Sequence, residues 1–147
     1  MFLVSQLSVV SGQLLVVLIL WRTLMARTNF ENLRVYNHSE ELADKIWDIV
    51  LGWNTFARDT VGKQLVKAAD SIGANIAEGT GRATYIDNRR FVKIARGSLN
   101  ETKHWLRTAH KRQLLSAKQI GSIKPLIDEL APKLNAYLNS IGRVPVG

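Results

Sequence analysis

The stretch that decides the fold runs from Val61 to Ala77 and reads VGKQLVKAADSIGANIA. Its apolar residues recur every three or four positions, a spacing that brings side chains onto one face of an α-helix. The residues on this face are Val61, Leu65, Ala68, Ala69, Ile72 and Ile76. We therefore predict an amphipathic helix from about Arg58 to Ala77. Gly79 and Gly81 follow it and predict a C-cap and a turn, because glycine tolerates positive φ.

The segment before this helix has the same periodicity. We predict a helix from about Asn37 to Trp53, with Asn37 or Ser39 as its N-cap. The residues on its buried face are Leu42, Ile46, Ile49, Val50 and Trp53. Trp47 falls outside this face, so we expect it to be exposed, either as an ordinary surface residue or as the anchor of a subunit contact.

Two more amphipathic segments follow toward the C-terminus. We predict the longest helix from about Thr84 to Gln113, and its buried stripe consists of Phe91, Ile94, Ala95, Ser98, Leu99, Thr102, Trp105, Leu106 and Ala109. The last helix follows Leu115, and its stripe consists of Ile123, Ile127, Leu130, Leu134, Leu138 and Ile141. We expect Pro125 to sit in the first turn of this helix, and Pro132 to kink or divide it.

Four amphipathic helices joined by short loops must bury their apolar faces against one another. This pattern predicts an all-α fold, an antiparallel up-down-up-down four-helix bundle from about Phe30 to Ile141. The length of 147 residues, 46% of them hydrophobic, suits one compact domain. The chain has no cysteine, which excludes disulfides and thiol nucleophiles. Gly73, inside a predicted helix, indicates that another backbone approaches closely there.

Residues 1–24 do not follow the bundle pattern. Residues 1–21 carry no charged side chain, and residues 14–21 are all apolar. We expect translation to begin at Met25, so that 1–24 is a misassigned N-terminal extension and 25–147 is the bundle domain. A membrane anchor is the alternative, although polar residues in the first half make the span marginal.

The positive charge of the chain gathers on one side of the longest predicted helix. The whole chain has a net charge of +8, and a 100° step per residue places six basic side chains in one sector opposite Phe91. They are Arg89, Lys93, Arg96, Lys103, Arg107 and Lys111. We predict that this sector binds nucleic-acid phosphates, because solvated faces usually mix both signs. An ordinary solvated face, or an oligomer interface that supplies acidic residues, remains the alternative.

No pattern in the chain indicates catalysis. Ser71, Asn75 and Glu78 share one flank of a predicted helix, without a histidine or lysine base, and we interpret them as a structural polar network. Glu78 and Glu101 are expected to cap the turn or to pair with Arg82 or Arg96. The three histidines, His38, His104 and His110, are scattered. We therefore predict a non-enzymatic protein without a metal or a cofactor.

Two runs carry a resemblance to a known family. These are SIGANIAEGTGR, from Ser71 to Arg82, and FVKIARGSLNE, from Phe91 to Glu101, and FENLRVY at residues 30–36 precedes them. Together they resemble the four-helix bundle proteins associated with intervening sequences in 23S rRNA genes. The resemblance covers about Phe30 to Ile141, and nothing in the family pattern matches residues 1–24.

The resemblance implies a bacterial all-α bundle that commonly forms a ring-shaped homopentamer. A related bundle, the accessory protein of diversity-generating retroelements, is similar in being a basic pentamer that engages nucleic acid and a reverse transcriptase. The family offers no catalytic residues, so its signature residues are expected to determine the bundle or its assembly, with Ala77 and Gly97 allowing close helix contact. They are Asn75, Ala77, Glu78, Gly79, Arg82, Gly97, Ser98 and Glu101.

These observations predict a cytoplasmic protein that binds rRNA, another structured RNA or other nucleic acid through the basic sector. The alternative is a structural or adaptor homo-oligomer that binds a protein partner. A membrane enters only if residues 1–24 are part of the expressed protein.

Overall fold

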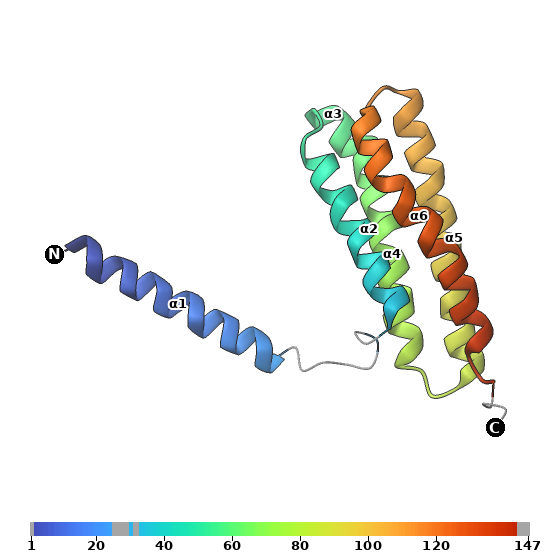
Figure 1. The fold of residues 1–147 in the computed structure, drawn as a ribbon, viewed down its shortest axis with the longest axis horizontal. Helices are drawn as coiled ribbons and strands as arrows, with labels where there is room; N and C mark the ends of the chain where they lie inside the picture. Colours follow the sequence, from blue (N-terminus) through green and yellow to red (C-terminus); the bar gives the residue numbers. More distant parts are fainter. Residues whose placement is uncertain (1, 25–29, 31–32, 144–147) are drawn as a thin grey trace.

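The computed structural model describes residues 2–24, 30 and 33–143. Every extended regular element in these residues is helical, so the predicted all-α class is confirmed. The helices are α1 (Phe2–Leu24), α2 (Arg34–Leu51), α3 (Thr55–Ala57), α4 (Lys63–Thr80), α5 (Tyr85–Lys111) and α6 (Ala117–Ser140), and a π-helical turn (Arg58–Gly62) joins α3 to α4. The long helices α2, α4, α5 and α6 lie side by side (Figure 1).

The α1 helix lies apart from the other helices in Figure 1. Its described side chains, residues 11–24, are all exposed. Within the part of the chain that the structure describes, no helix is long and apolar enough to cross a membrane. Met25 lies outside the described residues, so the division into 1–24 and 25–147 stays a prediction.

The core lies between α2, α4, α5 and α6. The apolar faces of α2 and α4 supply its centre, and α4 packs against both α2 and α5, while α6 covers α2. Full burial of a Leu or Ile side chain contributes about 1.5–3 kcal/mol, so this cluster is the main source of stability. The largest fully buried apolar side chains are Leu42, Ile46, Leu65, Ile72, Ile76, Leu99, Leu130 and Leu134.

The predicted ends of α2 and α4 were wrong in detail. The α2 helix begins three residues before Asn37, and its N-cap, Leu33, provides no side-chain hydrogen bond. Ser39 is buried inside the helix, where its hydroxyl donates to the Tyr36 carbonyl oxygen at 2.6 Å. Gly79 lies within α4, and the C-cap Gly81 has a φ of −82°, so neither glycine uses positive φ.

The α5 helix begins where the sequence predicts, but its buried face is rotated. The Thr84 side chain caps it by accepting a hydrogen bond from the Asp87 N–H. Val92 is fully buried, whereas Phe91 is half-buried and Ile94 is 44% exposed. The predicted burial of Ile94 is therefore wrong, because Val92 takes the core position in this turn.

The two prolines of α6 neither start nor divide it. The helix begins with a capping box formed by Ser116 and Gln119, and it continues through Pro125 and Pro132 to Ser140. Pro125 lies in the third turn rather than in the first. Each proline removes the N–H that would bond to the carbonyl four residues earlier. Those carbonyls belong to two exposed residues, where water can replace the missing donor.

Three glycines differ in what surrounds them. A Cβ on Gly73 would lie 2.5 Å from Glu40 Oε1 and 3.0 Å from Ser39 Oγ. Another helix does approach Gly73 closely, as expected. The atoms that approach belong to side chains of α2 and not to its backbone. A Cβ on Gly79 would lie 3.1 Å from Phe91 Cβ, whereas one on Gly97 would meet nothing within 4 Å. Gly97 therefore makes no close helix contact with the described residues, and its expected role in assembly stays a prediction.

The glycine pair gives a matched test of the packing between α4 and α5. Overpacking costs about 1–3 kcal/mol and Ala exceeds Gly in helix propensity by up to about 1 kcal/mol, so we expect Gly79→Ala to lower the free energy of unfolding. Gly97→Ala should raise it by up to about 1 kcal/mol, because only the propensity gain applies. Urea unfolding measures both changes. Equal effects of the two substitutions would contradict the described packing.

Carboxylates crowd the contact between α2 and α4. Burial raises the pKa of Glu40, with smaller contributions from Asp44 and Asp70, and a hydrogen bond with Tyr36 opposes the shift. Burial, and then Asp44, raise the pKa of Asp70. A carboxyl group with a raised folded-state pKa stabilises the fold below its unfolded pKa and loses that contribution as the pH rises through the folded value.

We therefore expect Glu40→Gln to raise the melting temperature slightly at pH 7, because Gln carries no charge to desolvate. The gain should disappear below the unfolded pKa of a glutamate, where the wild-type carboxyl is also neutral. Thermal unfolding between acidic and neutral pH measures it, with the exposed neighbour Glu41→Gln as control. A gain that persists unchanged in acid would mean that packing rather than charge causes it.

Candidate nucleic-acid interface

The charge of the bundle is divided between its helices. The α5 helix carries seven basic and two acidic residues, a net charge of +5 without its histidines. The α2 helix carries four acidic and two basic residues, a net charge of −2. Positive potential therefore concentrates on the side of the molecule that α5 forms.

The predicted basic sector lies beside α6 rather than directly opposite the core. Because Val92 replaces Phe91 at the core, α5 is rotated and its basic sector turns toward α6. Arg89 Nη1 donates to the carbonyl oxygens of Leu138, at 2.6 Å, and Ile141, at 3.5 Å. These carbonyls end α6, where cations are favourable. Arg89 therefore has a structural role in the chain.

Arg96 is also engaged by α6. Its Nη1 donates to Asn135 Oδ1 at 3.4 Å, and both side chains are exposed. The expected pairing of Glu101 with Arg96 is not formed, and Glu101 is exposed without an ion pair among the described residues. Arg96 therefore remains accessible, although a ligand would compete with a hydrogen bond.

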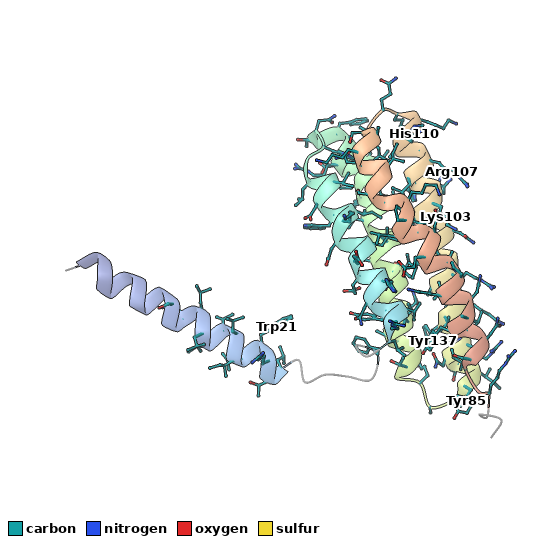
Figure 2. The ribbon with its side chains drawn as sticks, in the orientation of Figure 1. Trp21, Tyr85, Lys103, Arg107, His110 and Tyr137 are labelled. Atoms are coloured by element: carbon teal, nitrogen blue, oxygen red, sulfur yellow. The ribbon has the colours of Figure 1, made fainter. Side chains whose placement is uncertain are left out.

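The other four basic residues of the sector have no partner in the described part of the chain. Lys93, Arg107 and Lys111 are exposed, and Lys103 is half-buried. Figure 2 shows Lys103 and Arg107 along the outer side of α5, with His110 near its end. Unpaired cations on one helix face repel one another, so an anion that binds there relieves this repulsion.

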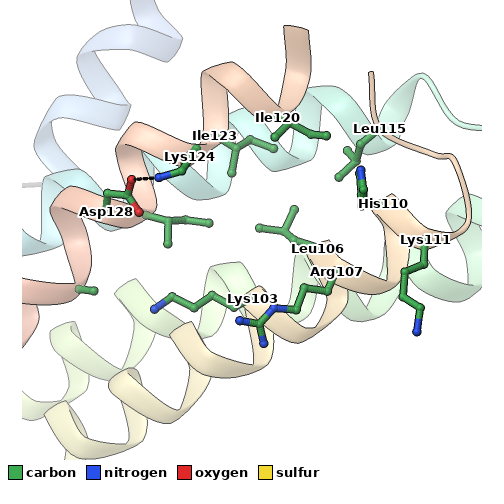
Figure 3. Close-up of a pocket in the computed structure, with 12 residues that line it drawn as sticks. Lys103, Leu106, Arg107, His110, Lys111, Leu115, Ile120, Ile123, Lys124 and Asp128 are labelled. Carbon is green, nitrogen blue, oxygen red and sulfur yellow. Dashed lines mark hydrogen bonds and ion pairs between the residues drawn. The ribbon is translucent and has the colours of Figure 1, made fainter. Parts of the chain in front are cut away.

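An apolar groove adjoins three of these cations. The groove between α5 and α6 has a volume of about 820 Å³. Lys103, Arg107 and Lys111 follow the α5 side of this α5–α6 groove, and Figure 3 shows Lys124 and Asp128 across it on α6. Its apolar residues are Leu106, Leu115, Ile120, Ile123, Ile127 and Ala131.

The acidic residue of the groove is already neutralised. Asp128 Oδ2 forms an ion pair with Lys124 Nζ one turn earlier on α6. The α5 side therefore keeps three positive charges, and no carboxylate of the groove is left to oppose them. Sequence periodicity assigned Leu106 and Ile127 to buried faces, but both are half-buried, and the groove they line was not predicted.

Part of the family signature, Glu78, Gly79 and Arg82, lies where α4 turns into α5. The predicted pair of Glu78 and Arg82 is present, with Nη2 and Oε1 2.6 Å apart. The Arg82 guanidinium also lies 4.6 Å from the centre of the Phe91 ring, and that of Arg90 lies 5.0 Å from it. Exposed ion pairs and cation–π contacts each contribute up to about 1 kcal/mol, so this cluster stabilises the turn modestly.

The remaining signature residues bond within their own helices or face solvent. Asn75 Nδ2 donates to the Ser71 carbonyl oxygen at 2.7 Å, and the buried Ser98 hydroxyl donates to the Ile94 carbonyl oxygen at 3.2 Å. Ala77 is half-buried and Gly97 is exposed. The predicted polar network on α4 is thus local to that helix.

The three histidines do not converge on a common site. His38 Nε2 lies 2.7 Å from Lys133 Nζ and 3.6 Å from Glu129 Oε1, which links α2 to α6. The hydrogen bond from Lys133 lowers the pKa of Glu129. His104 packs edge-on against Trp105. Among the residues that the structure describes, no group of three or more potential metal ligands converges.

Comparison with known proteins identifies the family. The family model described as 23S rRNA-intervening sequence protein matches residues 31–136. The structure is similar to the crystal structure of a protein of unknown function from the S23 ribosomal protein family of Bacteroides thetaiotaomicron. That match has 25% identity and a TM-score of 0.64, and it covers 72% of this chain and 96% of the other. No curated protein matches the chain. The chain therefore belongs to the 23S rRNA-intervening sequence protein family.

Proposed function

We propose that this protein binds structured RNA through the basic sector of α5. The observation that carries the proposal is the set of four basic residues of the sector that have no partner among the described residues, three of which line the α5–α6 groove. The four are Lys93, Lys103, Arg107 and Lys111. The family description adds support, because it connects these proteins with intervening sequences of 23S rRNA.

The dimensions of the sector suit a polyanion. Between Arg89 and Lys111 the helix rises by roughly 33 Å, since each residue contributes about 1.5 Å. This length is comparable to about one turn of a nucleic-acid duplex. Contacts to phosphates give affinity without base specificity, and released counterions make that affinity fall steeply with salt.

We further propose that the protein is an antiparallel bundle that assembles into a ring and acts in the cytoplasm. Short connections at residues 81–84 and 112–116 support an antiparallel up-down-up-down arrangement of the four long helices. Several copies in a ring would present several basic sectors, so that weak contacts would add up to useful avidity. Such a protein works by binding, without catalysis, and an rRNA partner would place it in the cytoplasm.

A second candidate function is that of a structural or adaptor homo-oligomer. Its support is an exposed apolar ridge on α2, where Trp47 and Leu51 are each 52% exposed. The prediction that Trp47 lies off the buried face is confirmed. Asp44 and Asp48 flank this ridge, and both are exposed. An apolar centre with a charged margin is typical of protein interfaces.

RNA binding is tested by filter binding to 23S rRNA fragments over a series of salt concentrations. We expect the affinity to fall steeply with salt, and Lys93→Gln with Lys111→Gln to reduce the slope of log K against log salt by about one unit per contact removed. Lys67→Gln, an exposed lysine on α4, is the matched control and should leave the slope unchanged. A salt-independent affinity of the wild type would contradict the proposal.

Assembly is tested by size-exclusion chromatography with light scattering on Trp47→Glu. A charge in the ridge should shift the mass toward that of a single chain, because burying an unpaired carboxylate is costly. Trp47→Phe keeps an apolar ring and should keep the mass of the wild type. Unchanged assembly of Trp47→Glu would remove the ridge from any subunit contact.

A further inference from the structure

We propose that the α5–α6 groove holds an unpaired strand of RNA, with its phosphates on the α5 side and its bases over the apolar floor. The inference rests on the proposed function and specifies the ligand of that site. It would make the preferred RNA one with a loop, bulge or single-stranded end rather than a continuous duplex.

The cations of the groove are spaced to follow a single strand. Lys103, Arg107 and Lys111 are separated by four residues each, so they lie on one face of α5 and are about 6 Å apart along the helix axis. Successive phosphates of an extended single strand have a similar separation. None of the three side chains forms an ion pair or hydrogen bond within the described residues, so each can contact one phosphate.

The apolar side chains on the floor of the groove can contact the bases of an unpaired strand, but not those of a duplex. Leu106 and Ile127 are half-buried, and Ile123, which also lines the groove, is buried. A duplex presents phosphates and sugars outward, while its base faces are stacked inside. A bound duplex would contact the cations, and the apolar side chains of the floor would stay in water. Unpaired bases laid on the floor remove apolar surface from water on both partners, which is favourable.

The composition of the floor also predicts how the bases are recognised. His110 provides the one ring among the residues that line the groove, and the other contacts come from aliphatic carbons. Every base has an apolar face, so such contacts tolerate any sequence, and they are weaker than stacking on aromatic residues. Asp128 is held by Lys124 and does not repel the phosphates. The groove should therefore select unpaired over paired RNA, with little preference among bases.

The experiment compares two RNA hairpins that share the same short terminal loop and differ only in a run of unpaired nucleotides in one strand of the stem, so that the loop contributes equally to both affinities. Fluorescence anisotropy with the full chain, over a salt series, measures both affinities. We expect wild type to prefer the hairpin with unpaired nucleotides by about fivefold in total, because several weak aliphatic contacts together match the low end of the range for stacking one base on an aromatic ring. Leu106→Ala with Ile127→Ala should abolish this preference and keep binding to the paired hairpin. Leu51→Ala, on the α2 ridge, should change neither affinity.

A second variant tests the phosphate contacts separately. Arg107→Gln should reduce the salt slope by about 0.7 on the hairpin with unpaired nucleotides, because one single-strand phosphate contact is lost. It leaves the floor intact, so a preference for unpaired RNA should persist. Circular dichroism confirms that each variant folds, and the wild-type comparison of the two hairpins requires no variant at all.

The outcomes separate the inference from the function it rests on. Equal affinity of wild type for both hairpins, with equal salt slopes, would overturn the inference and leave RNA binding standing. Binding to neither hairpin would overturn both. If the floor variants change the oligomeric mass and leave the preference for unpaired RNA intact, the floor is a protein contact and the inference is wrong.

Discussion

The rotation of α5 about its own axis determines which of its basic side chains bond to α6 and which line the groove. Val92, Ala95 and Leu99 reach the core, and the helix cannot turn without withdrawing them. With these residues fixed inward, the basic sector lies on the solvent-exposed side of α5 that adjoins α6. Arg89 and Arg96 then bond to α6, whereas Lys103, Arg107 and Lys111 line the groove. The packing of α5 thus gives Arg89 a structural role and leaves the other basic residues of the sector accessible to a ligand.

Much of the fold could be predicted because helix formation depends on local periodicity. The stripe from Val61 to Ile76 correctly predicted a helix and its buried face, although α4 begins at Lys63, and Thr84 marked the start of α5. What periodicity does not fix is the rotation of a helix within its apolar arc. Phe91, Val92 and Ile94 are all apolar, so their sequence alone could not show that Val92 occupies the core. That choice depends on tertiary packing, in which Phe91 meets Gly79 and two arginines.

The sequence predicted the basic residues of the candidate site, but it did not predict the groove that some of them line. Six basic residues at helical spacing identified the sector, but their partners come from α6, dozens of residues away. The groove depends on how far α5 and α6 separate near residues 103–111, and no property of either helix alone sets that distance. An apolar residue such as Leu106 or Ile127 suits a buried core and an apolar groove equally well. Only the arrangement of both helices distinguishes the two cases.

Because Arg89 bonds to the end of α6, the two ends of the α5–α6 pair are held together in different ways. Near residues 138–141, α6 is tied to α5 through a charged donor and two carbonyls, and Asn135 adds a second tie one turn inward. Toward residues 120–131, the groove replaces such ties. The pair is therefore held at both ends, by side-chain hydrogen bonds at Arg89 and by the chain itself at residues 112–116. The groove lies between these two attachments, so they limit how far it can widen.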